Sequence, residues 1–333
     1  MTILRFSASA DTTISNAFDI LEVFSIYGQE STASSELSRI LVQFPIDQIS
    51  SKRAAGTIPE SGSVNFVLKL YNAAHGETVP RNYKLIVAPL SQSWEEGLGL
   101  DMSNYTDLTY DKGGANWIQA RVSASNDDDG KWATEGGDYL VADILEASFD
   151  TGLEDLELDV SNIVEDWITG SAGSQYNNYG FGIRLSASYE ASSSANSSGA
   201  QTSYYTKKFF ARGSEFYYYR PCLEARWDSS VKDSRGAFHL SSAIAPASAN
   251  LNKLYFHNYV RGKLEDIAGN SGEAPSIEIY YSSGSIPEGT IRGILDSSNV
   301  AQTSITATRE SKGLYFATMA VTSGAVTDTY PYL

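Results

Sequence analysis

Apolar and polar residues alternate with a period of two along much of the chain. In residues 64–72, VNFVLKLYN, the side chains of Val64, Phe66, Leu68 and Leu70 fall on one face of an extended backbone. This alternation is typical of a strand with one buried face. The same period recurs in residues 83–90, 156–160, 179–188, 276–283 and 313–323. The pattern predicts an all-β chain.

One segment has the period of a helix instead. In SNIVEDWITG the apolar residues have the i, i+1, i+4, i+5 spacing of one helical face, and they are Ile163, Val164, Trp167 and Ile168. Asn162 is the predicted N-cap with Glu165 three residues on, and Gly170 is the predicted C-cap. We expect one short helix that covers an end of the sheet.

The polar and apolar pattern also suggests two domains. Residues 1–227 form the first, and residues 228–250 have few core residues and are predicted to be a linker. Residues 251–333 hold about five predicted strands, enough for a smaller immunoglobulin-like β-sandwich. Because the last residues, TDTYPYL, resemble the middle of a strand, we expect this sandwich to be incomplete at its C-terminal end.

Composition supports a folded β protein. Hydrophobic residues make up 42% of the chain and charged residues 19%, so a core can be buried. Aromatic residues reach 12%, with 21 tyrosines and 13 phenylalanines. Tyrosine together with β-branched residues favours half-buried pleated sheet.

Charge and cysteine usage exclude several classes of protein. The net charge of −16 argues against nucleic-acid binding, which needs a basic face, and against docking on an anionic membrane. The single cysteine, Cys222, excludes an internal disulfide and a cysteine-based zinc site. The first residues, MTILRFSASADTT, lack a basic region followed by an apolar stretch, so we expect no secretory signal. No run approaches the ~18 apolar residues of a membrane span.

Seven short segments of residues 1–227 form an ordered set of motifs. In chain order they are ADTTIS, LSRILVQFPI, VNFVLKLYNA, SQSWEEG, LDVSNIVEDWITG, NNYGFGIRL and KKFFARGSEFYYYRPCLEARW. Their motif positions are Arg39, Phe44, Trp94, Glu96, Gly97, Trp167, Gly170, Arg212, Arg220 and Pro221.

This ordered set resembles the DNRLRE-type domain, a jelly-roll module grouped with carbohydrate-binding modules. The chain departs from that pattern in long insertions at 98–116 and 187–204 and in its second domain. The resemblance implies an N-terminal jelly-roll β-sandwich with one short helix. It also implies a non-catalytic role and makes sugar binding one of the functions to consider.

Acidic residues and histidines are the candidates for catalysis and metal binding. Glu95 and Glu96 are neighbours, so on a strand they point to opposite faces and cannot flank a glycosidic bond. Asp127 and Asp129 lie in an acidic loop that suits either calcium or plain solvation, without EF-hand spacing. The three histidines, His75, His239 and His257, have no metal-ligand spacing. We therefore expect no enzyme and no cofactor.

Loop aromatics are the candidates for glycan contact. Trp117 and Trp132, with Tyr105 and Tyr110, lie in predicted loops, where they serve either sugar stacking or loop packing. In residues 217–227 the odd positions end in apolar residues and the even positions in charges. This pattern predicts a closing strand whose tyrosines are split between two faces. Pro221 has no N–H to donate, so it marks either the start of this strand or an unpaired edge.

Two functions fit these observations. The first is a structural virion protein of a tailed phage, such as a neck, collar, tail or capsid-decoration component. It would be made in the host cytoplasm and would contact other virion proteins and copies of itself in a symmetric assembly. The alternative is a carbohydrate-binding module or a glycan-recognising host-adhesion protein. A polysaccharide-active enzyme would need a carboxylate pair or a metal, which these residues do not supply.

Overall fold

The computed structural model describes residues 1–15, 25–30, 35–76, 81–96, 114–121, 130–170, 177–190, 204–267, 275–280 and 294–321. The chain is an all-β sandwich protein built from antiparallel sheets, as its alternation predicts. It divides into two compact units. The larger unit comprises Thr2–Ser51 and Val64–Trp227, and the smaller unit comprises Met1, Lys52–Ser63 and Asp228–Leu333.

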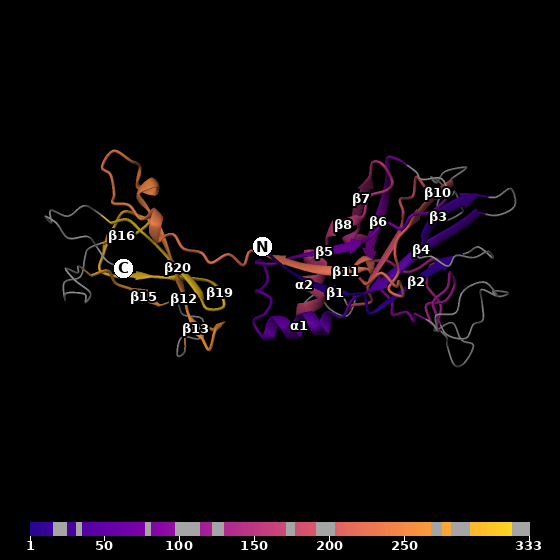
Figure 1. Cartoon of the computed structure of the whole chain (residues 1–333), viewed down its shortest axis with the longest axis horizontal. Coiled ribbons are helices and arrows are strands. Elements are labelled where there is room, and N and C mark those ends of the chain that lie inside the picture. Colours follow the sequence, from indigo (N-terminus) through magenta and orange to yellow (C-terminus); the bar gives the residue numbers. More distant parts are fainter. Residues whose placement is uncertain are drawn as a thin grey trace. The chain divides into compact units, whose positions relative to one another are not determined.

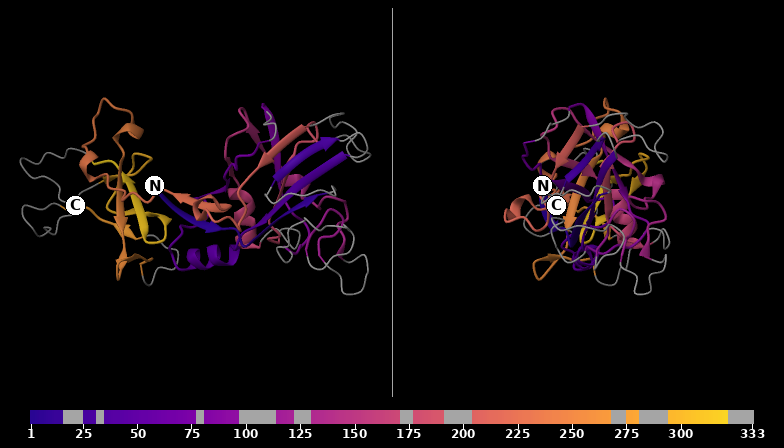
Figure 2. Two further views of the ribbon diagram at one scale, coloured as in Figure 1. Left: turned by 45° about the vertical axis from the view of Figure 1, so that its right-hand side comes forward. Right: turned by 90° about the vertical axis from the view of Figure 1, so that its right-hand side faces the viewer.

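Two antiparallel sheets form the larger unit. The first sheet has the order β1 (Thr2–Ser7), β11 (Cys222–Trp227), β5 (Asn65–Leu70), β8 (Leu156–Asp159). The second has the order β10 (Tyr204–Lys208), β3 (Ser25–Glu30), β4 (Ser35–Gln43), β9 (Phe181–Leu185), β6 (Tyr83–Pro89), β7 (Leu145–Phe149), with β2 (Ala10–Ser15) also paired to β4. Figure 1 shows β1 in indigo beside β11 in salmon, the two ends of this unit's sequence. The left view of Figure 2 shows the salmon strand β10 beside the indigo strands β3 and β4 of the second sheet.

The pairings in these sheets are nested. Taking β1, β4, β5, β6, β7, β8, β9 and β11 as a series, the first strand pairs with the last, the second with the seventh, the third with the sixth, and the fourth with the fifth. Successive pairs alternate between the two sheets. This nesting of eight antiparallel strands is the connectivity of a jelly roll, the fold expected for residues 1–227.

The inner faces of both sheets hold the core. Its fully buried side chains include Phe66, Leu68, Leu70, Leu223 and Ala225 from the first sheet, and Ile40, Val42, Leu85, Val87, Phe181 and Ile183 from the second. These residues are spaced by two along each strand, which explains why alternation located the strands. Burying side chains of this size contributes roughly 1.5–3 kcal/mol each.

The outer face of the second sheet is covered as well. Leu41 and Ile14 point away from the core, yet both are fully buried, in a cluster with Leu90, Trp117 and Trp132. The covering side chains come from residues 114–121 and 130–140. Around β4 and the middle of β6 the second sheet is therefore buried on both faces, which explains the apolar runs ILV and LIVA, whereas the outward Lys84 and Glu146 of β6 and β7 are exposed.

The described residues contain two α-helices, where the sequence predicted one. The predicted helix is α2 (Ser161–Thr169), which buries Ile163, Val164 and Trp167 and ends at Gly170 in the left-handed conformation (φ 60°). Its N-cap is Val160 and not Asn162, and it makes no side-chain capping bond. The unpredicted helix is α1 (Ile46–Ala54), which buries only Ile46 and Ile49 and so leaves little periodic signal.

The smaller unit has several short sheets. A three-stranded sheet has the order β12 (Asn252–His257), β20 (Leu314–Met319), β19 (Thr308–Ser311). Three two-stranded sheets pair β13 (Tyr259–Val260) with β14 (Lys263–Leu264), β15 (Ser276–Ile277) with β18 (Ile305–Thr306), and β16 (Ile294–Leu295) with β17 (Ala301–Gln302). An immunoglobulin-like strand order for this unit stays a prediction.

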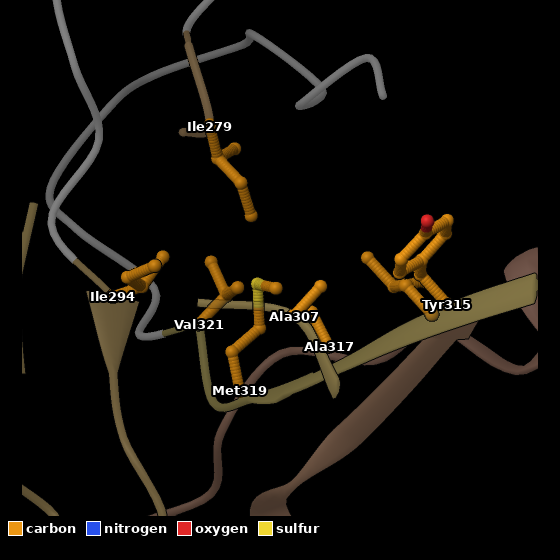
Figure 3. Close-up of a cluster of buried hydrophobic side chains, with 8 residues drawn as sticks. Ile279, Ile294, Ala307, Tyr315, Ala317, Met319 and Val321 are labelled. Carbon is orange, nitrogen blue, oxygen red and sulfur yellow. The ribbon is translucent and has the colours of Figure 1, made fainter. Parts of the chain in front are cut away.

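A separate core stabilises the smaller unit. Figure 3 shows Ile294, Met319 and Val321 directed toward one shared space with Ile279 above them. The stretch 228–250, predicted to be a linker, packs on this unit. Ser241 N–H donates to the carbonyl of Val321 (2.8 Å), and Phe238 lies against the core.

In the part of the chain that the structure describes, no helix has both the length and the apolar character to cross a bilayer.

Substitution of Gly180, which directly precedes β9, tests the close packing of this segment on β4. The φ of Gly180 is +85°, and a Cβ there would lie 2.2 Å from the backbone carbonyl oxygen of Val42. Gly170 also has a positive φ, +60°, but has open space around it. We expect Gly170→Ala to lower the free energy of unfolding by about 1–2 kcal/mol through backbone strain alone. Gly180→Ala should lower it by at least about 3 kcal/mol, because backbone must move as well. Denaturant unfolding followed by circular dichroism measures both, and equal losses would contradict the packing.

Candidate binding surface

Residues 216–219 form an exposed turn and not part of a strand. Tyr217–Tyr219 is one turn of 3-10 helix, and β11 begins only at Cys222. The prediction that β11 includes the tyrosine triplet is therefore wrong. The physical reason lies in local hydrogen bonds: Tyr219 N–H donates to the carbonyl of Phe216 (2.9 Å), and Arg220 Nε donates to the carbonyl of Ser214 (2.8 Å).

All four aromatic side chains of this segment, which we call the aromatic turn, are exposed. The exposed fractions are 52% for Phe216, 63% for Tyr217, 77% for Tyr218 and 46% for Tyr219. Large aromatic side chains are normally buried, so a contiguous exposed group of them marks an interaction site. The alternation of apolar and polar residues does not predict this exposed aromatic group.

Ring contacts hold the aromatic turn in place. Tyr219 stacks on Phe210 with a centroid distance of 5.1 Å and an interplanar angle of 18°, and it contacts Tyr71 at 5.6 Å. Phe216 meets Phe210 edge to face at 5.9 Å. Since Tyr71 directly follows β5, the base of the turn is tied to the first sheet. Aromatic pairs of this kind contribute about 0.5–1.5 kcal/mol each.

Tyr217 and Tyr218 project from this base. Their rings lie 5.7 Å apart at 80°, so they present two perpendicular surfaces. The guanidinium of Arg220 lies 5.5 Å from the centre of the Tyr217 ring. A ligand would meet one ring face backed by a cation and a second ring that is almost entirely open.

The predicted tryptophan contacts are not on this surface. Trp117 and Trp132 are 7% and 5% exposed, and both belong to the buried cluster on the outer face of the second sheet. Trp132 Nε1 donates to the carbonyl of Asn116 (2.8 Å), and the Arg39 guanidinium lies 4.9 Å from the Trp117 ring. Rings covered in this way have no free face for a sugar, so the alternative of loop packing holds for these two. Tyr105 and Tyr110 lie outside the described residues.

Several residues that carry the resemblance are packed or hydrogen-bonded within this fold. Phe44 is fully buried and Trp167 packs on Phe181 with 4.8 Å between centroids. Trp94 Nε1 donates to the carbonyl of Tyr179 (2.8 Å). Pro221 is buried and its carbonyl accepts the N–H of Ala8, while Gly97 lies outside the described residues.

Arg39 organises a second polar cluster. Its Nε and Nη2 donate to the carboxylate of Glu190, both at 3.1 Å, and its Nη1 donates to the carbonyl of Gly136 (2.9 Å). The Glu190 side chain is buried and has a second cation, Arg184, at 3.9 Å. Burial raises the pKa of Tyr139, whose ring lies beside both arginines. All charges of the cluster are paired, which is the condition for burying them.

Asp11, Glu96 and Arg212 form a third cluster. Arg212 binds Glu96 through Nε at 3.0 Å and through Nη2 at 2.6 and 2.7 Å, and its backbone N–H donates to Asp11 (2.5 Å). The backbone N–H of Asp11 donates to Glu96 in turn (3.0 Å). Burial raises the pKa of Asp11 to about 6, with the charge of Glu96 acting in the same direction. This cluster connects segments that are 85 to 201 residues apart.

Metal binding has no support in the described residues, where no three His, Cys, Asp or Glu side chains are grouped to hold an ion. The predicted calcium candidates Asp127 and Asp129 lie outside these residues.

No protein-family model matches the chain, and no curated protein matches its sequence. The resemblance to the DNRLRE-type domain therefore stays a prediction.

The sequence did contain signals for the aromatic turn. Gly213 and Ser214 precede it and Pro221 follows it, and these residue types mark turns. Pro221 also lacks the N–H that a ladder position needs. The interpretation of Pro221 as the start of the strand agrees with the structure, because β11 begins at Cys222, whereas the alternation from Tyr217 to Arg220 does not mark a strand.

Asp11 makes stability depend on pH. Because its folded pKa is raised, the folded state holds a proton that the unfolded chain releases between about pH 4 and 6. The contribution of the Asp11 carboxyl to the free energy of unfolding therefore falls as pH rises through that window, by up to about 3 kcal/mol. Asp11→Asn removes the titration. The free energy of unfolding of the variant, minus that of the wild type, should rise from pH 4 to pH 6.5 and then level off. A difference that does not change with pH would contradict the raised pKa.

Proposed function

We propose that this protein is a non-enzymatic β-sandwich module that binds a carbohydrate on its aromatic turn. The observation that carries the proposal is the exposure of Tyr217 and Tyr218, 63% and 77%, on a base fixed by stacking. Exposed aromatic faces stack on the C–H surfaces of sugar rings, and their hydroxyl groups bond sugar hydroxyls. A rigid base reduces the entropy lost on binding.

The net negative charge of the chain favours a neutral glycan over an anionic one as the ligand. The chain carries a net charge of −16, which disfavours approach of a polyanionic polysaccharide at low ionic strength. The one cation placed against these rings, among the described residues, is Arg220, which already lies over Tyr217 and donates to Ser214. A neutral polysaccharide with accessible ring faces therefore fits the surface best.

Substitution of the two outer tyrosines tests this function. We expect Tyr217→Ala and Tyr218→Ala each to weaken glycan affinity about threefold to tenfold, the value of one stacking contact. Tyr218→Phe keeps the ring and should retain most of the affinity. A glycan array with the full chain identifies the ligand, and calorimetry then measures the variants.

Tyr259→Ala is the matched control. Tyr259 is 54% exposed and lies in the smaller unit, so its loss should leave glycan affinity unchanged. An array without retained glycan at low and high salt would refute the carbohydrate proposal. Equal affinity of Tyr218→Ala and wild type would place the binding site elsewhere.

A structural role in a phage virion is the second candidate. Tyrosine and phenylalanine are enriched at protein interfaces, so the aromatic turn also suits contact with another virion protein or with a copy of this chain. The two compact β units would then act as rigid blocks in a neck, collar, tail or capsid decoration. Mass spectrometry of purified particles is the test, and absence of the chain from the particles would reject this role.

A further inference from the structure

Lys207 is a buried amine next to a side-chain amide. It lies in β10 and is only 1% exposed. Its Nζ is 2.7 Å from Oδ1 of Asn72, 2.9 Å from the carbonyl of Gly152 and 2.7 Å from the carbonyl of Glu154. Buried lysines are rare because moving the ammonium out of water is costly. The aromatic turn does not use this residue.

Aromatic rings surround the amine. Nζ lies 4.9 Å from the centre of the Phe149 ring and 5.0 Å from that of Phe209. Tyr83 stacks on Phe149 with 5.1 Å between the ring centroids. Burial lowers the pKa of Lys207 to about 8, against the charges of Glu154 and Asp155, which raise it. At pH 7 roughly a tenth of the protein molecules then have Lys207 as the neutral, nucleophilic amine.

The backbone holds both partners in position. Asn72 lies two residues after the end of β5 in the first sheet and forms an isolated bridge with Phe209. Ala73 N–H donates to the carbonyl of Lys208 (2.9 Å), and Asn72 N–H donates to Asp155 (2.9 Å). The contact between Nζ and Oδ1 places the amine next to the Asn72 amide. Reacting atoms that are held together and aligned react as though at very high concentration, on the order of 10⁵ M or more.

We propose that Lys207 and Asn72 join in an intramolecular amide bond. The neutral Nζ attacks Cγ of Asn72, a bond forms between Nζ and Cγ, and the bond between Cγ and Nδ2 breaks. One proton moves from Nζ to the leaving nitrogen, which departs as ammonia. The reaction needs neither an oxidant nor a further reactant.

The bond would link the two sheets of the larger unit. Asn72 extends from β5 in the first sheet, and Lys207 is on the edge strand of the second. The residues are 135 apart in sequence, so the link would close a long loop. Such a link limits the unfolded chain as a disulfide does. A chain with Cys222 as its single cysteine has no internal disulfide to do this.

Intact-mass spectrometry of the purified wild-type chain tests the proposal. The bond makes the protein about 17 Da lighter than its sequence, the mass of one ammonia. Lys207→Arg and Asn72→Ala should both have full sequence mass. Because succinimide formation at any asparagine also releases ammonia, protease digestion must in addition yield one branched peptide that contains both Lys207 and Asn72.

The outcomes are distinct. A lighter wild type with the branched peptide supports the bond. Full sequence mass in the wild type overturns it and leaves Lys207 as a hydrogen-bonded structural lysine, a result that needs no variant to fold. A mass loss that persists in Lys207→Arg also overturns it. Glycan binding by the aromatic turn does not depend on any of these results.

Discussion

Strand β11 closes the larger unit by pairing with β1 along one edge and β5 along the other. Its inward side chains, Leu223 and Ala225, are fully buried, and its outward Glu224 is only 1% exposed. A carboxylate so deeply buried is tolerated only when it is paired. Arg5 donates to one oxygen of Glu224, and Arg226 donates twice to the other. Because β11 joins the outermost nested pair to β5, the whole jelly roll depends on this strand.

The position where β11 begins decides what precedes it. Pro221 has no N–H to donate, and the chain before it leaves the sheet as a turn stabilised by its own hydrogen bonds. The tyrosines of that turn are thus exposed beside a rigid sheet and not buried within one. Binding residues are commonly found on such loops, because the scaffold holds them without covering them. Lys207 lies shortly before the same turn, where the two sheets approach each other through Asn72 and Phe209.

Local pattern predicted several of the strands and one helix correctly. Alternation located β5, β6, β8, β9 and β20, and the spacing of Ile163, Val164 and Trp167 located α2. These signals are readable because each element shows a repeating contrast between buried and exposed sides. Helix α1 was missed because only Ile46 and Ile49 contact the core. The runs ILV and LIVA interrupt the alternation within β4 and β6, and an unbroken apolar run indicates that this stretch of a strand is covered on both faces.

The candidate site was less predictable than the fold. Trp117 and Trp132 lie in polar segments, which predicts exposure, but both are buried because they cover part of the outer face of the second sheet. Residues of the aromatic turn were assigned to a strand because a short alternation was extended past Pro221. In both cases exposure depended on which other segment packs there, and no local pattern records that.

By itself, the sequence determined the all-β class, the positions of the main strands and the α2 helix, because these follow from contrasts between neighbouring residues. Only the tertiary structure decided which distant residues meet. Arg212 pairs with Glu96 across 116 residues, and Lys207 reaches Asn72 across 135. It also decided that two tryptophans are buried while three consecutive tyrosines are exposed. The reason is physical: alternation distinguishes the two faces of a strand, but the nested pairing of the sheets determines what covers each face.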